Sequence, residues 1–492
     1  MTERPDESTA RHGRTSRRQG EGTERSGTLV LSDEKAYVGD TVTFKGRNFP
    51  PGEAFDVVWH SVQGSWGVLQ ANEIVGPQFR PRSETIFTVE ADDSGAFDAE
   101  WTVPDEYGGS HRVEVQAADA ADDEDPVATA ELELVPWFEL DRTEARMGET
   151  FTLRGYGLGP DVMQNNYQVA WDNGYVGFLT GVQNRGTATA EVRAVGPPGE
   201  HVIQVWRNYR GVPYLLNNTQ SPFGSVAGGR QTAWRVDVSE PDSAPRTAWM
   251  DDLFDESPID LHYRGLADET DAELEISPQC GQAGTTAIIT GRQFEPNTEV
   301  DLVWYRHEGH EPRGTASTPD PKIGPVAKPD VLPTVTSDAD GRFQVEVTIP
   351  TDIGSTRPIT AAVGGRQVAA TGFMMQPSVE RFEPRSGPVG TEIEIELSGI
   401  GWTAYENAPY FVYDNKPLGY LCGTGGDDET GTVKPVLHAT GEPGWHFIDA
   451  YPSLFWVEDD HPDFQLKPHL SYLDNHPVRP LPAFHFAFEV TE

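Results

Sequence analysis

Internal repetition is the feature that most constrains what this chain can fold into. Residues 49–59 (FPPGEAFDVVW) are echoed by residues 294–304 (FEPNTEVDLVW), and both ends are shifted by 245 positions. Residues 92–104 (DDSGAFDAEWTVP) are likewise echoed by residues 338–350 (DADGRFQVEVTIP). Repeats of this kind settle the architecture before any single residue is interpreted. The chain therefore holds two copies of one module type, called A and A′ here.

A second motif set lies after each of these modules. Residues 171–173 (WDN) are echoed by residues 413–415 (YDN), and residues 196–201 (GPPGEH) by residues 441–446 (GEPGWH). These motifs differ from those of A and A′, so they define a second module type, B and B′. The order along the chain is A-B-A′-B′.

The length of 492 residues fits this reading, because four modules of roughly 110 residues each have a typical domain size. We predict the following organisation: a disordered N-terminal tail over 1–26, domain A over 27–135, domain B over 136–241, an acidic linker over 242–272, domain A′ over 273–376 and domain B′ over 377–492.

The local patterns favour strands. Residues 343–349 and 393–397 alternate apolar and polar side chains, as expected for a sheet with one buried face. The chain has 50 glycines and 39 prolines, spread along it as turn signals every 8–12 residues or so. No amphipathic helix of ten or more residues stands out. The sequence therefore predicts an all-β protein of four tandem β-sandwiches, in which Trp59 and Trp304 lie between the sheets.

Charge excludes some classes of partner. The formal net charge is −41, so the surface repels nucleic acid phosphates and anionic membranes. Only seven of the 37 basic residues are lysines, and an acidic, lysine-poor surface resembles proteins of halophilic microbes. No apolar run approaches the roughly 18 residues needed to span a bilayer. We therefore expect neither nucleic acid binding nor membrane insertion.

The N-terminal residues 1–26 are polar and rich in arginine, which predicts disorder. Residues 15–18 (TSRR) suggest a twin-arginine export signal, but the polar residues 19–22 (QGEG) follow where an apolar stretch is needed. No signal peptide is recognisable. Cys280 and Cys422 lie outside the shared motifs, so they imply neither a disulfide framework nor a metal site.

Two stretches resemble a known family. Residues 39–52, with Asp93-Ser94-Gly95 and Val103-Pro104, look like the immunoglobulin-like modules of bacterial and archaeal surface proteins. Residues 382–399 look like the start of the IPT/TIG variety of these modules. The resemblance covers about nine-tenths of the chain and implies an extracellular or cell-surface location. It is specific for fold rather than function, because such modules serve many roles.

The B-type domains carry the best candidates for a ligand site. Polar groups recur there in matching places, with Tyr175 and Trp206 nearby in sequence, and could hydrogen-bond and stack on a sugar. The structural interpretation is stronger, because Asp-Asn is turn chemistry and a histidine after Pro-Gly begins a strand. The candidates are Asp172, Asn173, His201, Asn217 and Asn218 in B, and Asp414, Asn415, His446, Asp474 and Asn475 in B′.

Metal and catalytic signals are weak. His461, His469 and His476 lie among acidic residues, but they lack the spacing of a tight ligand pair. The acidic turns at 92–95 and 338–341 resemble fragments of calcium loops without the full pattern, so calcium at inter-domain seams stays an alternative to plain hairpin turns. No catalytic motif is present, and we expect no cofactor and no enzyme activity.

Three functions fit these observations. The leading one is a non-catalytic surface protein that acts as spacer, adhesin or interaction scaffold toward a protein or glycan partner. The second is an array of carbohydrate-binding modules. The third is a structural subunit of a filament, virion or injection apparatus, which would assemble with copies of itself.

Overall fold

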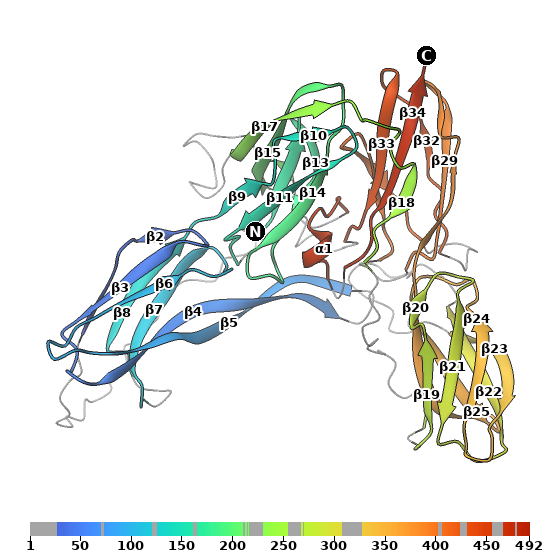
Figure 1. The fold of residues 1–492 in the computed structure, drawn as a ribbon, viewed down its shortest axis with the longest axis horizontal. Helices are drawn as coiled ribbons and strands as arrows, with labels where there is room; N and C mark the ends of the chain where they lie inside the picture. The colour runs from blue at the N-terminus through green and yellow to red at the C-terminus, as the bar shows by residue number, and fades with distance from the viewer. Residues whose placement is uncertain are drawn as a thin grey trace, which may run out of the picture.

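The computed structural model describes residues 27–69, 73–120, 125–160, 165–209, 212–213, 215, 230–253, 267–268, 270–307, 327–401, 406–423, 431–454, 466–477 and 480–492. These residues form eight β-sheets, each with three, five or six strands. The sheets pair into four sandwiches, which Figure 1 shows in sequence colours from blue to red. The predicted all-β, immunoglobulin-like sandwich fold is confirmed.

Sandwich A joins a three-stranded sheet, β1-β3-β6, to a five-stranded sheet, β2-β8-β7-β4-β5. Strand β2 runs parallel to β8, and the other neighbours are antiparallel. The strands are β1 (Thr28–Leu31), β2 (Lys35–Ala36), β3 (Thr41–Arg47), β4 (Ala54–Leu69), β5 (Glu73–Glu90), β6 (Phe97–Thr102), β7 (Gly109–Ala117) and β8 (Ala128–Leu134).

Sandwich B repeats this order with the sheets β9-β11-β14 and β10-β17-β15-β12-β13, and the short β16 pairs with β15. Its strands are β9 (Trp137–Leu140), β10 (Glu144–Arg146), β11 (Thr150–Tyr156), β12 (Tyr167–Trp171), β13 (Gly174–Leu179), β14 (Ala188–Arg193), β15 (Gly199–Tyr209), β16 (Val212–Pro213) and β17 (Arg230–Ser239).

Sandwich A′ has the sheets β19-β21-β24 and β20-β26-β25-β22-β23. Its strands are β19 (Glu273–Ser277), β20 (Cys280–Gly281), β21 (Thr286–Arg292), β22 (Glu299–His307), β23 (Ala327–Thr336), β24 (Phe343–Thr348), β25 (Ser355–Val363) and β26 (Arg366–Met375).

Sandwich B′ has the sheets β27-β29-β32 and β34-β33-β30-β31, with β28 beside β34. Its elements are β27 (Ser378–Glu383), β28 (Ser386–Pro388), β29 (Glu392–Ser398), β30 (Tyr410–Tyr413), β31 (Lys416–Tyr420), β32 (Val436–His438), β33 (Gly444–Tyr451), the short helix α1 (Tyr472–Asn475) and β34 (Phe484–Thr491).

All four sandwiches therefore share one strand order, in which the second strand pairs in parallel with the last. In each sandwich the first strand pairs within the smaller sheet, and the short second strand pairs with the larger sheet. The chain thus crosses from one sheet to the other near its start, as in immunoglobulin-like folds. The IPT/TIG assignment, the domain ranges and the closer likeness of A to A′ than to B stay predictions.

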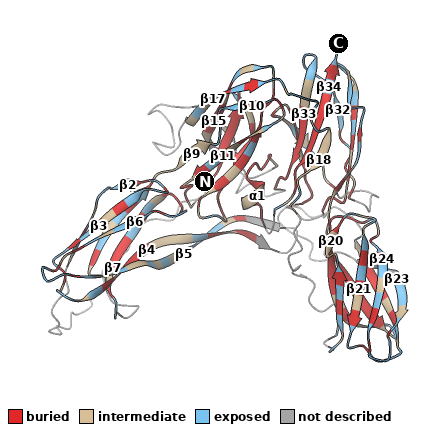
Figure 2. Ribbon diagram, viewed as in Figure 1, coloured by how far each residue is buried: buried red, intermediate tan, exposed pale blue. Residues whose placement is uncertain are grey.

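The cores follow the period-2 pattern of the sequence. In β3 buried and less buried residues alternate, with Val42, Phe44 and Gly46 facing inward. Figure 2 shows the same stripes of buried residues along the strands of each sandwich. Trp59 and Trp304 are buried in the cores of A and A′, which confirms that prediction.

Part of the predicted linker is strand. Residues 248–250 form β18 (Ala248–Met250), which pairs antiparallel with β34 and extends the sheet of B′. The alternation of side chains explains the pairing, because Ala248 and Met250 pack against the B′ core while Trp249 points to the other side.

Strands β4 and β5 form a long hairpin of 16 and 18 residues. It runs out of sandwich A and passes beneath B toward α1 (Figure 1). Near its end, the Trp66 Nε1–H donates to the Asn475 carbonyl oxygen over 2.8 Å. The first module therefore contacts the last one directly.

Candidate functional site at the B–B′ interface

The Asp-Asn pair of B forms a two-residue hairpin turn between β12 and β13. Asp172 and Asn173 have φ angles of 48° and 66°, as a type I′ turn requires. Asp172 accepts a 2.6 Å hydrogen bond from Nδ1 of His201 and a 2.9 Å bond from the Val202 amide. The other ring nitrogen of His201 lies 2.8 Å from the Pro197 carbonyl oxygen. The histidine therefore ties the turn to the start of β15.

The same arrangement recurs in B′. Nδ1 of His446 lies 2.6 Å from Asp414, and Nε2 lies 2.8 Å from the Glu442 carbonyl oxygen. Both neighbours can only accept, so both ring nitrogens donate. Burial lowers the pKa of His446, but the hydrogen bond and the charge of Asp414 outweigh it and raise the pKa above its usual value. We call each Asp–His pair a staple.

The asparagines of the predicted site do not join the staples in one place. Asn173 accepts a bond from Gln204 on the face of B's larger sheet. Asn415 donates 2.8 Å to the Arg193 carbonyl oxygen of B, and Asn475 accepts 3.0 Å from the Gln183 amide of B. Asn217 and Asn218 lie outside the described residues. Asp474 accepts 3.0 Å from the Thr189 amide of B. Ligand binding by this set stays a prediction, and three of its members, Asn415, Asp474 and Asn475, contact the neighbouring sandwich.

Sandwiches B and B′ share one hydrophobic core. Side chains on the outer face of the larger B′ sheet join the cluster that fills B, together with residues that follow β33. In Figure 1 the two sandwiches stand side by side, with β18 and α1 at their contact. The B′ contributors are Val412, Phe447, Tyr451, Leu470, Tyr472, Ala483 and Ala487.

A buried ion pair crosses this interface. Arg193 at the end of β14 donates to Asp449 of β33 through Nη2 over 2.8 Å and through Nε over 3.0 Å. The two side chains are only 4% and 2% exposed, so both charges depend on this partner. The guanidinium also lies 5.2 Å from the Trp249 ring centroid and 5.7 Å from that of Phe447.

His485 extends the ion pair into a chain of four charges. Its Nδ1 lies 2.6 Å from Asp449 and its Nε2 lies 3.0 Å from Asp251, which follows β18. Nη2 of Arg193 also lies 2.7 Å from Nδ1. The raised pKa of His485 favours the protonated ring, in which Nδ1–H donates to Asp449 and the approach of Arg193 is a contact between two donors. With His485 protonated, two positive charges balance two negative ones.

The pKa directions agree with this balance. Burial would raise the pKa of Asp449, but Arg193 and His485 lower it to about 2. Burial would lower the pKa of His485, but hydrogen bonds to Asp251 and Asp449 raise it above its usual value. Residues from B, from the segment after β18 and from B′ therefore form one electrostatic unit, the interface network.

Residues 466–476 of B′ lie against sandwich B and bond to it. Ser471 accepts a bond from the Thr180 amide and donates one to the Thr180 carbonyl oxygen, each over 2.9 Å. Asn475 donates 3.1 Å to the Thr187 carbonyl oxygen. This segment therefore makes contacts between the two modules.

The A–B and A′–B′ junctions are built alike. The Gly108 amide donates 3.2 Å to the Leu158 carbonyl oxygen, and the Gly354 amide donates 3.1 Å to the Ile400 carbonyl oxygen. A Cβ at either glycine would come within 2.0 or 2.1 Å of a carbonyl oxygen of the next sandwich, so only glycine fits. The two junctions therefore share the same close backbone contact.

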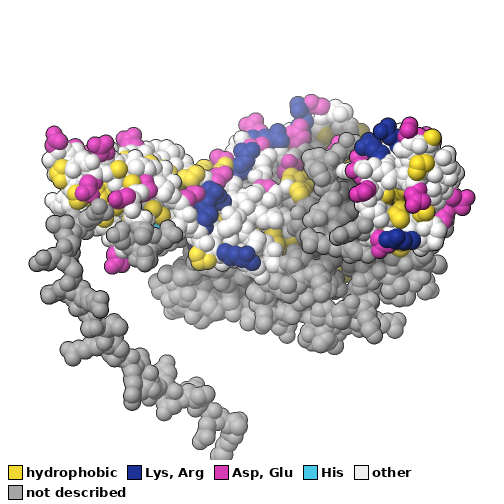
Figure 3. Space-filling view, turned by 90° about the horizontal axis from the view of Figure 1, so that it is seen from below, with side chains coloured by type: hydrophobic (Ala, Val, Ile, Leu, Met, Phe, Trp, Pro, Cys, Tyr) yellow, Lys and Arg dark blue, Asp and Glu magenta, His cyan; other side chains and the backbone are white. Residues whose placement is uncertain are grey.

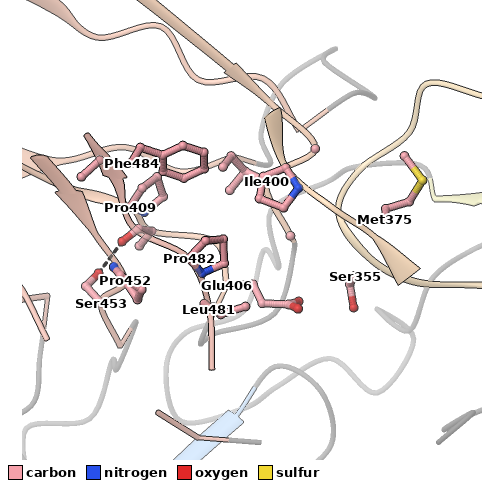
Figure 4. Close-up of a pocket in the computed structure, with 15 residues that line it drawn as sticks. Ser355, Met375, Ile400, Glu406, Pro409, Pro452, Ser453, Leu481, Pro482 and Phe484 are labelled. Atoms are coloured by element: carbon pink, nitrogen blue, oxygen red, sulfur yellow. Dashed lines mark hydrogen bonds between the residues drawn. The ribbon is translucent and has the colours of Figure 1, made fainter. Parts of the chain in front are cut away.

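A small cavity of about 40 Å³ lies at the A′–B′ junction (Figure 4). Met375 comes from A′, while Ile400, Pro409 and Phe484 come from B′. At the position matching Pro409, B carries the larger Tyr167, which is buried against Phe138. The cavity has room for water or a small apolar group and is far below the roughly 300 Å³ of ordinary ligand pockets.

Among the described residues, no group of three or more His, Cys, Asp and Glu side chains is placed to hold a metal ion. Asp92 accepts bonds from the amides of Ser94 and Ala96, as hairpin-turn chemistry requires. His469 is buried and stacked on Phe178, and burial sets its pKa well below the usual value. His461 lies outside the described part of the chain.

Sequence reasoning missed the interface network. One signal was available: Asp449 stands inside the apolar run of residues 445–451 (WHFIDAY), where a charge needs a buried partner. Its partner Arg193 could not be named, because B′ has His438 at the matching place and the contact joins residues 256 positions apart.

In the described part of the chain, no helix is long and apolar enough to cross a membrane. No protein-family model matches the chain, and no curated protein matches it either.

The comparison with solved structures does find similar chains. One is Salmonella alpha-2-macroglobulin, at 12% identity over 93% of this chain and 30% of that one, with a TM-score of 0.18. A second is invasin, a bacterial integrin-binding protein, at 9% identity over 94% and 79% with a TM-score of 0.19. A third is the D0–D1 domain of intimin, at 14% identity over 39% and 91% with a TM-score of 0.14. At these scores the likeness carries no argument about function, and the fold assignment rests on the strand order above.

Proposed function

We propose that this chain is a non-catalytic interaction module, a rigid surface scaffold or adhesin whose two arms are held at a fixed angle. The observation that supports it most is the shared core of B and B′, closed by the buried pair of Arg193 and Asp449. Domains in one chain move relative to one another by default, and a large hydrophobic interface restricts that motion. The arms are the sandwiches A and A′.

The junctions add to the rigidity. Close backbone approach at Gly108 and Gly354 leaves little room for rotation between the sandwiches of each half. The β4–β5 hairpin ties A to the far side of the interface through Trp66. A body of this kind presents surfaces at set distances, which suits a spacer or a binding scaffold outside the cell.

Small-angle X-ray scattering of the full chain tests the rigid arrangement. We expect a single bent shape whose pair-distance distribution matches Figure 1, and a broader distribution for Asp449→Ala. A wild-type profile that requires freely moving domains would contradict the proposal.

The interaction role is tested with the full chain immobilised and offered a panel of surface proteins and glycans. Saturable binding of a protein supports an adhesin or scaffold. Turnover of a substrate by the purified chain would overturn the non-catalytic assignment.

Carbohydrate binding is the second candidate, and one observation favours it. On the outer face of B, Trp206 Nε1–H donates 3.0 Å to Gln204, which donates 3.2 Å to Asn173. Amides beside an indole can bind and stack on a sugar. Binding to glycans that is lost in Trp206→Ala, without binding to any protein, would replace the scaffold proposal with this one.

A further inference from the structure

One edge of sandwich B is covered by a peptide from elsewhere in the chain. Strand β13 is the last strand of the larger sheet, and residues 468–470 lie alongside it in a parallel bridge. The Phe178 amide donates 3.0 Å to the Pro468 carbonyl oxygen, and the Leu470 amide donates 2.8 Å to the Phe178 carbonyl oxygen. The segment therefore adds to the sheet through its backbone, as in β-augmentation.

Strand β31 holds the same place in B′. Each strand follows its Asp-Asn turn directly, so Val176 corresponds to Leu418 and Phe178 to Tyr420. Val176 and Phe178 are 1% and 0% exposed, whereas Leu418 and Tyr420 are 51% and 41% exposed. The two edges carry the same kind of side chain, but within the described ranges a segment pairs only with the edge in B.

The backbone of β31 is set up for pairing. The Leu421 amide donates 3.2 Å to the Pro409 carbonyl oxygen, on one side of the opposed residues Tyr410 and Tyr420. In an antiparallel ladder this pattern directs the N–H and C=O of Tyr420 away from β30, toward the open edge. No residue in the described ranges bonds to them there.

A glycine keeps both edges open to close approach. A Cβ at Gly177 would lie 2.6 Å from the Pro468 carbonyl oxygen and 2.8 Å from Leu470, so the bound segment needs glycine here. Strand β31 has Gly419 at the matching position, and no atom of the described residues lies within 4 Å of where its Cβ would be. No described residue therefore fills in B′ the space that the segment fills in B.

We propose that the β31 edge of B′ docks an extended, uncharged strand of a partner protein, with apolar side chains at alternate positions. The model for this occupant is the segment on β13, residues 468–470, in which the apolar Pro468 and Leu470 flank His469. Proteins normally block exposed edges with charges, prolines or bulges, and β31 has Lys416, Pro417 and a bulge in its first half. Its second half has none of these, and Tyr420 there is exposed. The proposal rests on the interaction function above and names the surface and chemistry it uses.

The probe is a labelled synthetic peptide of residues 466–476, titrated into the full chain and followed by fluorescence anisotropy. We expect saturable binding that Leu418→Lys weakens at least tenfold. Tyr420→Pro removes the outward amide and should abolish the binding. Val436→Lys is the matched control, because Val436 is also an exposed apolar strand residue but lies on β32, and it should bind like the wild type.

The β13 edge does not confuse this result. Its own segment is tethered at an effective concentration of about millimolar, so the added peptide competes poorly there. Circular dichroism checks that each variant is folded, and Leu418→Lys leaves the backbone of the edge intact.

Absence of binding to the wild type, or equal binding to the β31 variants, would overturn the proposal. Self-association of the wild type that both variants abolish, without peptide binding, would overturn it in favour of a second copy as occupant. Either result leaves the rigid shape measured by scattering unaffected, so failure here is distinct from failure of the scaffold proposal.

Discussion

Sandwiches B and B′ have the same strand order and the same staple, but their matching surface positions make different contacts. Three residues after the staple histidine, B has Gln204 and B′ has Asp449. Gln204 bonds to side chains of its own sheet, whereas Asp449 bonds to Arg193 of the other sandwich. At the edge of the larger sheet, it is B that contacts another segment: residues 468–470 pair with β13, whereas Leu418 and Tyr420 of β31 are exposed.

The comparison teaches that divergence between the two sandwiches lies on the surfaces that meet another element. Inward positions need only apolar groups of suitable volume, so Val205 of B and Ala450 of B′ serve alike. At outward positions, the residue type that is tolerated depends on the element that packs against it. A buried carboxylate is tolerated at 449 because Arg193 and His485 supply two positive charges.

The largest expected effect comes from breaking the ion pair. Asp449→Ala leaves Arg193 buried without its carboxylate and should cost roughly 3–5 kcal/mol in the free energy of unfolding, measured by chemical denaturation. Gln204→Ala is the matched control in B and removes neutral hydrogen bonds worth about 0.5–1.5 kcal/mol each. Equal losses would show that the two positions do not differ in the way the comparison requires.

The next effect is pH dependence at the interface. The pKa of His485 is raised on folding, so its stabilisation is complete below the unfolded pKa of about 6.5 and is lost as pH rises through the folded value. The pKa of Asp449 is lowered, so its contribution is present above about pH 4 and is lost as pH falls toward about 2. We expect the unfolding free energy to be highest between these limits.

His485→Gln separates this network from other groups. The variant should be less stable, and its unfolding free energy should fall less steeply above pH 6.5 than that of the wild type. His446 also has a raised pKa and contributes to the alkaline fall in both proteins, so the difference between the two curves is what counts. Parallel curves would mean that His485 does not titrate with folding.

The staples should give a smaller effect that differs between the two sandwiches. Asp414→Asn keeps a residue suited to the positive φ but removes the charge that holds His446, and should cost about 1 kcal/mol. Asp172→Asn should cost less, because the side chain of Asp172 is 45% exposed against 17% for Asp414, and solvent screens its bond to His201. Thermal denaturation of both variants measures the difference, and a larger loss at Asp172 would contradict it.

Salt should act on the whole molecule rather than on one sandwich. Acidic side chains are spread over the face in Figure 3 rather than gathered in one patch, and the net charge is −41. Because the Debye length falls from about 30 Å at 0.01 M to about 3 Å at 1 M, we expect the melting temperature to rise by several degrees between these conditions. A flat response would show that local arginines already balance the charge.

Local patterns predicted much of the fold. The repeated motifs and alternating strands predicted tandem β-sandwiches, and the family resemblance added their immunoglobulin-like character. The Asp-Asn pairs predicted hairpin turns that the φ angles of Asp172 and Asp414 confirm. The pairing of β18 was missed, because three residues inside an acidic stretch give too short a pattern to read as a strand.

The sequence by itself determined the sandwiches, since alternation, turn residues and apolar core positions act over neighbouring residues and recur with each module. Only the tertiary structure decided how the sandwiches meet. Arg193 bonds to Asp449, Trp66 bonds to Asn475 and residues 468–470 pair with β13, and each contact joins residues hundreds of positions apart. The reason is physical: a strand's pattern reports which face is buried, but the identity of what buries it depends on which distant surface packs there.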